Sequence, residues 1–428
     1  YMHRAKEFVC ERRWTMSSEV LFVWVYLPHW VEPVVAGRLN ISATAAAGAK
    51  VGEFVYGKSY LARTEAIAID PCTLPLQEAA KEFTTLLGYP GAIIDACPDR
   101  WGIRVIDRLC GQQVFPSGYL LTNDPGRSGA LAFSRSPDEV PQELTSREFI
   151  LEELLSATAA VEANQPVDPE LLKALHPGTG GARPKCNIVE DGAVWIAKFP
   201  SATDDPTISV PRLEHATMAL ARACGVDVAE TRIKRIGDRD VCLVRRFDRI
   251  VESARITRKG FVSARTVFYA DPAFATQGTG SYARLARWLG RYGVPADLKT
   301  EIFRRMVFNC AVRNTDDHDL NHGLVQSSNG DYALAPAYDI LPALPLPVAK
   351  INHHALLIGD DASDTVENLL SNSEAFGLKK GGALAIVEDV ERTVLSQWEE
   401  IFYECGFGDW ERNKLAPCFR PLPTFSDN

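Results

Sequence analysis

The stretch NTDDHDLNHG, residues 314–323, places three carboxylates, two histidines and two asparagines within ten positions, directly after an apolar run. Asp316 and Asn321 in this stretch are separated by four residues. In kinases, an aspartate that orients the attacking hydroxyl is followed at the same spacing by an asparagine that binds Mg²⁺. The spacing therefore predicts a phosphoryl-transfer site in which Asp316 is the catalytic base and Asn321 is a metal ligand.

A second metal ligand is predicted further along the chain, in the segment DYALAPAYDIL. Asp339 follows a short apolar run of β type in this segment. Mg²⁺ prefers a few hard oxygen ligands and keeps several of its water molecules, so one asparagine and one aspartate suit it. We therefore predict that Asp339 is the second ligand. We also expect a helix over 300–313 to hold the polar loop, because its apolar residues recur one turn apart and predict a buried face.

The groups that would hold the phosphates are predicted from an earlier part of the chain. Glycines in the segment GTGGARPK allow backbone N–H groups to approach phosphates closely. A β-hairpin with its turn at Asp191-Gly192 follows, and Lys198 stands on its second strand. A helix over 211–224 comes next and carries Glu214, which is the carboxylate we expect to pair with Lys198.

Composition limits the class of protein. A chain of 428 residues with 46% hydrophobic content can bury a core and predicts two or three domains. The net charge of −9 argues against broad, sequence-independent binding to nucleic acid. No apolar stretch approaches the length of a membrane span. The ten cysteines are scattered, with no C-x-x-C pair, which indicates reduced thiols and favours the cytoplasm.

The predicted order of elements divides the chain into four parts. We expect residues 1–17 to be an extension or a tag outside the fold. Residues 18–165 predict a mainly β N-terminal domain followed by an acidic connector that is helical in pieces. Residues 166–252 contain two hairpins on either side of a helix, the second turning at 237–238, which predicts a β-rich lobe. Residues 253–428 are predicted to be largely helical.

This order of features resembles the HipA family, the toxin kinases of bacterial toxin–antitoxin pairs. The resemblance is carried by GGARPK, WIAKFPS, LEHATMALARACGVDVAETR, VRRFDR, RRMVFNCAVRNTDDHDLNHG and LAPAYDILP, and the stretches PDRWG and SGALAFS extend it towards the N-terminus. It covers about residues 20–345. The resemblance implies an α+β, protein-kinase-like two-lobed fold, with a β-rich N-lobe, a helical C-lobe and an additional mainly β N-terminal domain.

The resemblance also implies which residues bind ATP, and it gives the polar loop and the later aspartate the roles predicted above. Lys198 would hold the α- and β-phosphates, and the loop 180–185 would lie over them. Arg246 and Phe247 would offer backbone contacts to adenine, and Asp248 would reach the ribose. The implied ATP-binding residues are Gly180, Gly181, Ala182, Arg183, Lys185, Lys198, Glu214, Arg246, Phe247, Asp248 and His318.

The implied activity is transfer of the γ-phosphate of ATP, with Mg²⁺, to a Ser or Thr of a cellular protein. The implied partners are a small DNA-binding, HipB-like antitoxin and a protein substrate, with translation components among the candidates. Contact with DNA would be indirect, through the antitoxin, and no membrane contact is expected.

The sequence departs from the family pattern in two places. Some members carry a regulatory serine before the glycine-rich loop, and its autophosphorylation stops the enzyme. The corresponding place here reads Pro177-Gly178-Thr179, so either Thr179 takes that role or this control is absent. In addition, no H-R-D triplet precedes Asp316 and no D-F-G contains Asp339.

Three alternatives use the same residues differently. A small-molecule kinase would keep the fold and change the acceptor. A binding module without catalysis would act through its partner alone. A zinc hydrolase would use the H-x-x-x-H spacing of His318 and His322, which requires both histidines on one face of a helix.

Overall fold

The computed structural model describes residues 18–43, 50–85, 87–114, 116–144, 146–175, 181–253, 255–270, 280–291, 296–327, 330–343 and 349–427. The chain divides into two compact units, and each is taken in turn. The first unit consists of Tyr1–Ala202, Arg245–Val262 and Val325–Tyr332. The second consists of Thr203–Val244, Ser263–Leu324 and Ala333–Asn428. The domain boundaries drawn from the sequence stay predictions.

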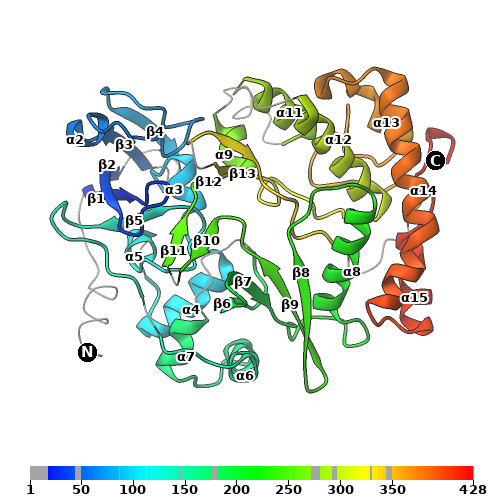
Figure 1. Cartoon of the computed structure of the whole chain (residues 1–428), viewed down its shortest axis with the longest axis horizontal. Coiled ribbons are helices and arrows are strands. Elements are labelled where there is room, and N and C mark those ends of the chain that lie inside the picture. The colour runs from blue at the N-terminus through cyan, green and yellow to red at the C-terminus, as the bar shows by residue number, and fades with distance from the viewer. Residues whose placement is uncertain are drawn as a thin grey trace. The chain divides into compact units, whose positions relative to one another are not determined.

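The first unit contains a five-stranded antiparallel sheet (Figure 1). Its strands, in spatial order, are β4 (Lys81–Thr85), β3 (Lys50–Tyr56), β2 (Val34–Ala43), β1 (Ser18–Val25) and β5 (Leu131–Ser134). Leu21, Val23 and Val25 of β1 are buried on one face. Trp24 packs in a cluster with Ala132 on the other face. Because β1 is covered on both sides, its sequence is a continuous apolar run rather than an alternating one.

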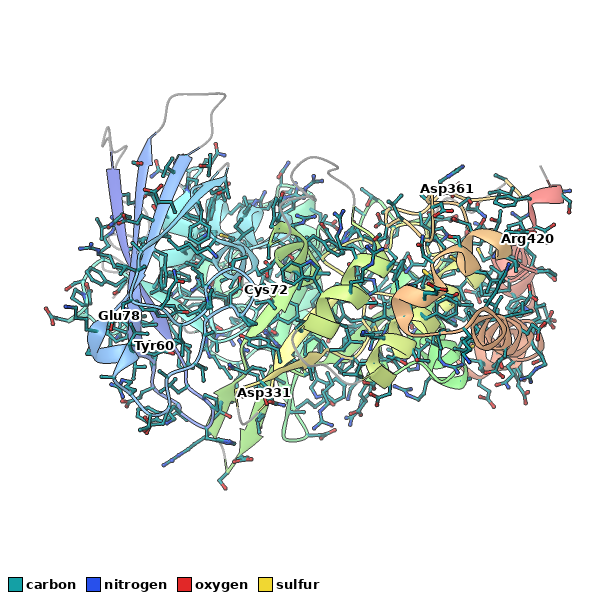
Figure 2. All side chains as sticks on the ribbon, turned by 90° about the horizontal axis from the view of Figure 1, so that it is seen from above. Tyr60, Cys72, Glu78, Asp331, Asp361 and Arg420 are labelled. Carbon is teal, nitrogen blue, oxygen red and sulfur yellow. The ribbon has the colours of Figure 1, made fainter. Side chains whose placement is uncertain are left out.

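The first unit also contains helices. They are α2 (Lys58–Leu61), α3 (Gly91–Asp95), α4 (Arg100–Cys110), α5 (Pro116–Leu121), α6 (Leu151–Glu162) and α7 (Pro169–Ala174). In α2, Tyr60 stacks on Tyr56 of β3 with ring centroids 5.8 Å apart, beside the blue strands in Figure 2. Helix α4 begins at its N-cap Asp99 and ends before Gly111, whose positive φ of 70° a glycine adopts without strain.

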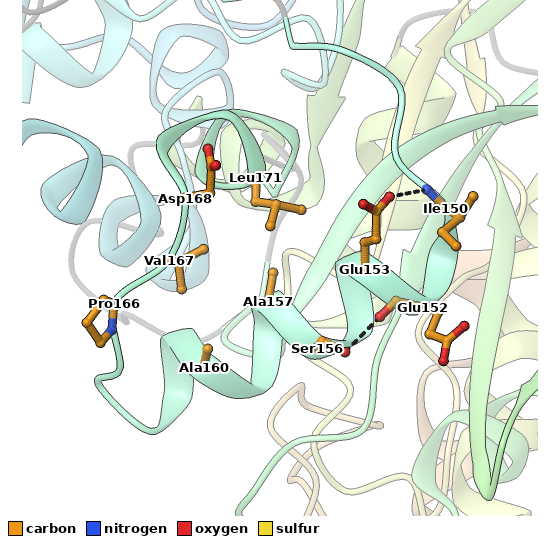
Figure 3. Close-up of a pocket in the computed structure, with 10 residues that line it drawn as sticks. All are labelled: Ile150, Glu152, Glu153, Ser156, Ala157, Ala160, Pro166, Val167, Asp168 and Leu171. Carbon is orange, nitrogen blue, oxygen red and sulfur yellow. Dashed lines mark hydrogen bonds between the residues drawn. The ribbon is translucent and has the colours of Figure 1, made fainter.

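The connector predicted to be helical in pieces contains α6, and α7 follows it. A groove of about 450 Å³ lies between them, with an apolar floor that includes Ala157, Val167 and Leu171 (Figure 3). At the start of α6, the carboxylate of Glu153 accepts a hydrogen bond from the backbone N–H of Ile150 at 3.1 Å. This contact satisfies an N–H group that the helix itself leaves unpaired.

Two hairpins complete the first unit. The first joins β6 (Lys185–Glu190) to β7 (Ala193–Lys198), and the second joins β10 (Arg249–Glu252) to β11 (Arg255–Arg258). Asp191 and Gly192 have φ values of 52° and 70° between β6 and β7. Two successive positive φ values are the requirement of a type I′ turn, so the hairpin predicted at this step is confirmed.

The second unit opens with α8 (Val210–Ala223) and the hairpin of β8 (Thr231–Ile236) and β9 (Arg239–Arg245). The hydroxyl of Ser209 accepts a hydrogen bond from the backbone N–H of Arg212 and caps α8. Gly225, with φ of 76°, follows its end. One stripe of the helix is buried and consists of Leu213, Ala216, Thr217, Leu220, Ala221 and Cys224.

The rest of the second unit is largely helical, as predicted. It contains α9 (Ala264–Tyr269), α11 (Tyr282–Arg291), α12 (Ala296–Ala311), α13 (Val366–Ser371), α14 (Lys380–Glu404) and α15 (Asp409–Leu415), with 3₁₀ turns η1 (Ser373–Phe376), η2 (Ala416–Cys418) and η3 (Phe425–Asp427). Helix α14 packs against α12 and α8 (Figure 1). The apolar face of α12 is buried as predicted and consists of Ile302, Phe303, Met306, Val307, Cys310 and Ala311.

Three short strands lie where the chain passes from one unit to the other. They are β12 (Phe261–Ser263), β13 (Gly323–Gln326) and β14 (Tyr332–Leu334). Within the described residues, no helix is long and apolar enough to cross a membrane.

Candidate functional site

The polar loop of residues 314–322 lies in the second unit and starts where α12 ends. Arg313 has a φ of 59°, which turns the chain out of the helix. Its fully buried guanidinium donates hydrogen bonds to the carbonyl oxygens of Cys310 at 2.7 Å and Pro421 at 2.8 Å. A cation at this position also interacts favourably with the carbonyl end of the helix dipole. The start of the loop is therefore fixed against the core.

Two adjacent carboxylates in this loop have opposite environments. Asp316 is exposed, and its carboxylate has no hydrogen-bond partner among the described residues. Asp317 is 2% exposed and accepts hydrogen bonds from His322 Nε2 at 2.7 Å and from the hydroxyl of Tyr282. Burial by itself raises the pKa of Asp317, but His322 and these two hydrogen bonds lower it below its ordinary value. Asp317 thus holds the loop while Asp316 stays accessible.

The hydrogen bonds around Asp317 extend back to α12. The side-chain amide of Asn309 donates to the hydroxyl of Tyr282 at 3.1 Å. The side-chain amide of Asn314 donates to Asn309 Oδ1 at 3.0 Å. These asparagines and Tyr282 are buried, so the first residue of the loop is tied to two helices, α11 and α12.

Helix α9 holds the other end of the loop. The backbone N–H of Ala264 donates to the carbonyl oxygen of His322 at 2.8 Å. Arg265 makes a two-point contact with the carboxylate of Asp319, from Nη2 to Oδ1 at 2.7 Å and from Nε to Oδ2 at 3.0 Å. Such a bidentate pair fixes orientation as well as distance. The loop is therefore held at both ends and in the middle.

The two predicted metal ligands are brought to the same part of the second unit. Asn321 is 6% exposed, and its side-chain amide has no hydrogen-bond partner in the described ranges. The hydroxyl of Tyr338 donates to the carbonyl oxygen of Leu320 at 2.8 Å, which joins the residue before Asp339 to the residue before Asn321. Asp339 itself has a φ of 60°. One amide oxygen and one carboxylate are donors that fit Mg²⁺ with water as its other ligands.

The zinc alternative is wrong. Residues 314–322 form turns rather than a helix, so the H-x-x-x-H spacing does not place both histidines on one helical face. Nε2 of His322 is already paired with Asp317. Within the part of the chain that the structure describes, no group of three or more His, Cys, Asp or Glu side chains is placed to hold a metal ion.

The predicted phosphate-binding residues that precede the hairpin lie in the first unit. Gly181, Ala182 and Arg183 are exposed in a bend before β6, whereas Gly180 and Thr179 lie outside the described residues. Gly181 has a φ of 119°, which only glycine adopts readily. Lys198 is the last residue of β7.

Glu214, the predicted partner of Lys198, lies in α8 of the second unit and is 4% exposed. Because Lys198 belongs to the first unit, their pairing stays a prediction. His318 accepts a hydrogen bond at Nδ1 from the backbone N–H of Leu320 at 3.3 Å, within the polar loop. Its predicted contact with ATP also stays a prediction.

Lys185 is paired with a carboxylate in the structure. Its Nζ donates to Asp99 Oδ2 at 2.8 Å, and the side chains of Lys185 and Asp99 are 4% and 5% exposed. This pair holds the start of β6. The predicted contact of Lys185 with phosphates stays a prediction.

Asp248 is also part of a buried ion cluster. Its Oδ1 accepts from Arg246 Nε at 2.8 Å, and its Oδ2 accepts from Arg246 Nη2 at 2.7 Å, Arg249 Nη1 at 2.9 Å and the backbone N–H of Gly129 at 2.9 Å. Burial opposes ionisation, but the two arginines hold the pKa of Asp248 below its ordinary value. These bonds give Asp248 a structural role in the first unit, and its predicted contact with the ribose stays a prediction.

Backbone groups of Arg246 and Phe247 are the predicted contacts with adenine. The backbone N–H of Arg246 donates to the carbonyl oxygen of Val194 at 2.8 Å and is therefore used within the first unit. The ring of Phe247 lies 6.1 Å from that of Phe261. The backbone contact of Phe247 with adenine stays a prediction.

Three buried residues that hold the polar loop were missed by sequence reasoning: Asp317, His322 and Tyr282. The doublet Asp316-Asp317 shows that two carboxylates are adjacent but not which of them is buried. His322 was considered only as a metal ligand. Tyr282 lies 35 residues before Asp317 in the chain, and no local pattern connects them.

Comparison with known proteins identifies the family. The sequence model of the HipA-like C-terminal domain matches residues 178–398, which is more than half of the chain. The chain belongs to the HipA-like family. The putative kinase Y4dM of Sinorhizobium fredii is 32% identical over 166 residues, which cover 36% of this chain and 38% of that protein. The chain thus matches well under half the length of this curated relative.

The fold is that of HipA. The HipA of Shewanella oneidensis MR-1, solved in a complex with HipB and operator DNA, matches with a TM-score of 0.62 and 17% sequence identity. The match covers 93% of this chain and 94% of that chain. The predicted kinase-like α+β fold with an additional N-terminal part is therefore confirmed for this HipA-like chain.

The adjacent carboxylates of the polar loop give a matched pair of variants. Asp317→Asn removes the charge that pairs with His322 and is expected to lower the free energy of unfolding by about 3 kcal/mol or more. Asp316→Asn changes an exposed carboxylate and is expected to change the free energy of unfolding by less than about 0.5 kcal/mol. Thermal unfolding followed by circular dichroism measures both. Equal midpoints for the two variants would contradict the assignment of the buried role to Asp317.

The Asp248 cluster predicts a pH dependence. Because the folded-state pKa of Asp248 lies below the unfolded value of about 3.9, its ionised form stabilises the protein above that pH and loses this effect as the pH falls further. Asp248→Asn is therefore expected to lower the melting midpoint strongly at pH 7, by a difference that shrinks below about pH 4. Asp238→Asn, at a 91% exposed side chain, serves as the control and should leave the midpoint unchanged. If the difference in melting midpoint between the wild type and Asp248→Asn grew as the pH fell below about 4, ionised Asp248 would not be stabilising.

Proposed function

We propose that this protein is an ATP-dependent Ser/Thr protein kinase and the toxin of a toxin–antitoxin pair. One observation supports it most. A loop held at both ends presents an exposed Asp316 and, four residues further on, an Asn321 whose amide has no partner among the described residues. The segment that carries Asp339 is hydrogen-bonded to the same loop. In protein kinases a catalytic aspartate, a metal-binding asparagine and a later metal-binding aspartate follow one another in this order.

Asp316 has the accessibility that a catalytic base needs. In the proposed reaction the hydroxyl oxygen of the acceptor attacks the γ-phosphorus, the bond to the β-phosphate oxygen breaks, and ADP leaves. The hydroxyl proton passes to the carboxylate of Asp316. Asn321 and Asp339 would hold Mg²⁺, which supplies positive charge to the β- and γ-phosphate oxygens.

The remaining predicted residues bind the nucleotide in this proposal. Lys198, oriented by Glu214, attracts the α- and β-phosphates. Gly181, together with its neighbours in the glycine-rich segment, offers backbone N–H groups to the phosphates. Phe247 offers its backbone to adenine, and His318 lies in the same loop as the base.

The proposed partners follow from the family and the comparison. A HipB-like antitoxin is proposed because the matching Shewanella structure is a complex of HipA with HipB and operator DNA. The protein substrate is a cellular protein, with translation components as candidates, and DNA is reached only through the antitoxin. We propose that the protein acts in the cytoplasm. We also propose that it regulates itself by autophosphorylation at Thr179.

Phosphoryl transfer to protein is tested with labelled ATP, Mg²⁺ and a bacterial lysate, using the purified protein and its Asp316→Asn variant. A lysate protein labelled by the wild type alone, with label on Ser or Thr, is the expected result. Turnover of the variant should fall by about 10²–10⁴-fold, because the base no longer accepts the proton. Wild-type turnover in Asp316→Asn would remove Asp316 from the mechanism. Mg-ATP binding without any labelled protein would favour a small-molecule acceptor.

Variants of Lys198 and Asp316 should have different effects on ATP affinity and on turnover. Lys198→Ala removes the cation on the phosphates and is expected to weaken ATP binding and to lower turnover. Asp316→Asn is expected to lower turnover and leave ATP affinity nearly unchanged. Isothermal titration with ATP and Mg²⁺, together with steady-state kinetics, measures both quantities. Unchanged ATP affinity in Lys198→Ala would contradict the role of Lys198.

A further inference from the structure

The stretch PDRWG, which has no role in the proposed chemistry, contacts the chain before the glycine-rich segment and at the last residue of that segment. Trp101, in the first turn of α4, is 2% exposed. Its indole N–H donates to the carbonyl oxygen of Leu175 at 3.2 Å and to that of Lys185 at 2.9 Å. Leu175 precedes the glycine-rich segment GTGGARPK, and Lys185 is the last residue of that segment. One donor therefore holds together two chain positions ten residues apart.

Asp99 holds the same end of the segment through a side chain. Its Oδ1 accepts from the backbone N–H of Gly102 at 2.6 Å, as the N-cap of α4, which fixes the carboxylate relative to the helix. Its Oδ2 accepts from Lys185 Nζ at 2.8 Å. The main chain and the side chain of Lys185 are thus both held by the start of α4.

The described residues between these contacts leave their backbone accessible. Gly181, Ala182 and Arg183 are exposed. A Cβ on Gly181 would lie 2.6 Å from Lys185 Nζ, so the held ammonium limits the path of the chain at this point. The carbonyl oxygen of Pro184 accepts from the backbone N–H of Phe199 at 3.0 Å.

We propose that Asp99 and Trp101 are positioning residues for residues 181–185, the described part of the phosphate-binding segment. They act through Lys185, without touching the nucleotide, and hold the backbone of residues 181–183 ready to receive the β- and γ-phosphates of ATP. Affinity gained this way comes from ordering that is complete before the ligand binds. This inference rests on the proposed function, because it requires that the segment binds phosphates.

A purely structural role for Trp101 has a different consequence. If the indole only filled the core, its loss would lower the affinity of the folded protein for every ligand to the same degree. If it positions the phosphate-binding segment, only ligands with phosphates are affected. Adenosine lacks the phosphates, so the ratio of ATP affinity to adenosine affinity separates the two roles.

The test uses the full chain with Trp101→Phe, which removes the indole N–H and keeps an aromatic ring. Trp24→Phe is the matched control, because Trp24 is 5% exposed and its indole N–H donates to Ser134 Oγ at 2.7 Å in the five-stranded sheet. Isothermal titration measures the dissociation constants for ATP with Mg²⁺ and for adenosine. We expect Trp101→Phe to raise the dissociation constant for ATP by about tenfold or more, since small displacements of binding groups are costly. The dissociation constant for adenosine should stay unchanged. Trp24→Phe should change neither.

A second variant covers the case in which Trp101→Phe does not fold. Asp99→Asn keeps an acceptor for the N–H of Gly102 and removes the charge that faces Lys185, and it should show the same selective loss of ATP affinity. If the wild type binds ATP and the variants lose affinity for ATP and adenosine equally, or lose none, the positioning role is overturned. If the wild type binds neither ATP nor adenosine, the proposed function fails and this inference fails with it.

Discussion

A carboxylate that leaves water must be paired with donors, and in the second unit this requirement falls on Asp317. Its two donors, Tyr282 and His322, come from α11 and from the far end of the polar loop. Asp317 points into the protein, and its neighbour Asp316 is left in solvent. The accessibility of the proposed base is thus a consequence of the burial of its neighbour.

The first unit uses buried charge in a similar way. Lys185 and Asp99 are paired across 86 positions of sequence, and the N–H of Gly129 reaches Asp248 across 119. Each pair joins a segment next to the predicted nucleotide-binding residues to the N-terminal part of the chain. Removing one partner would leave the other buried and unpaired, which is more costly than the pair is favourable. The additional N-terminal part is therefore part of the framework of the proposed site.

The elements that sequence reasoning predicted well depend on residues close to one another in the chain. Asp191-Gly192 requires positive φ values and forms its turn without distant contacts. Helix α8 has a serine cap at Ser209 and Gly225 after its end. The sequence also offers Asp316 and Asn321 at the spacing found in protein kinases, and their roles stay a prediction.

The sequence by itself determined the family resemblance, the helices and hairpins, and the candidate residues for catalysis. Only the tertiary structure decided which of two adjacent aspartates is buried, that Lys185 pairs with Asp99, and that Asp248 lies between two arginines. The physical reason is the range of the interactions. Turn and cap preferences act over a few residues, whereas the burial and pairing of a charge depend on groups that are distant in sequence and meet only when the chain has folded.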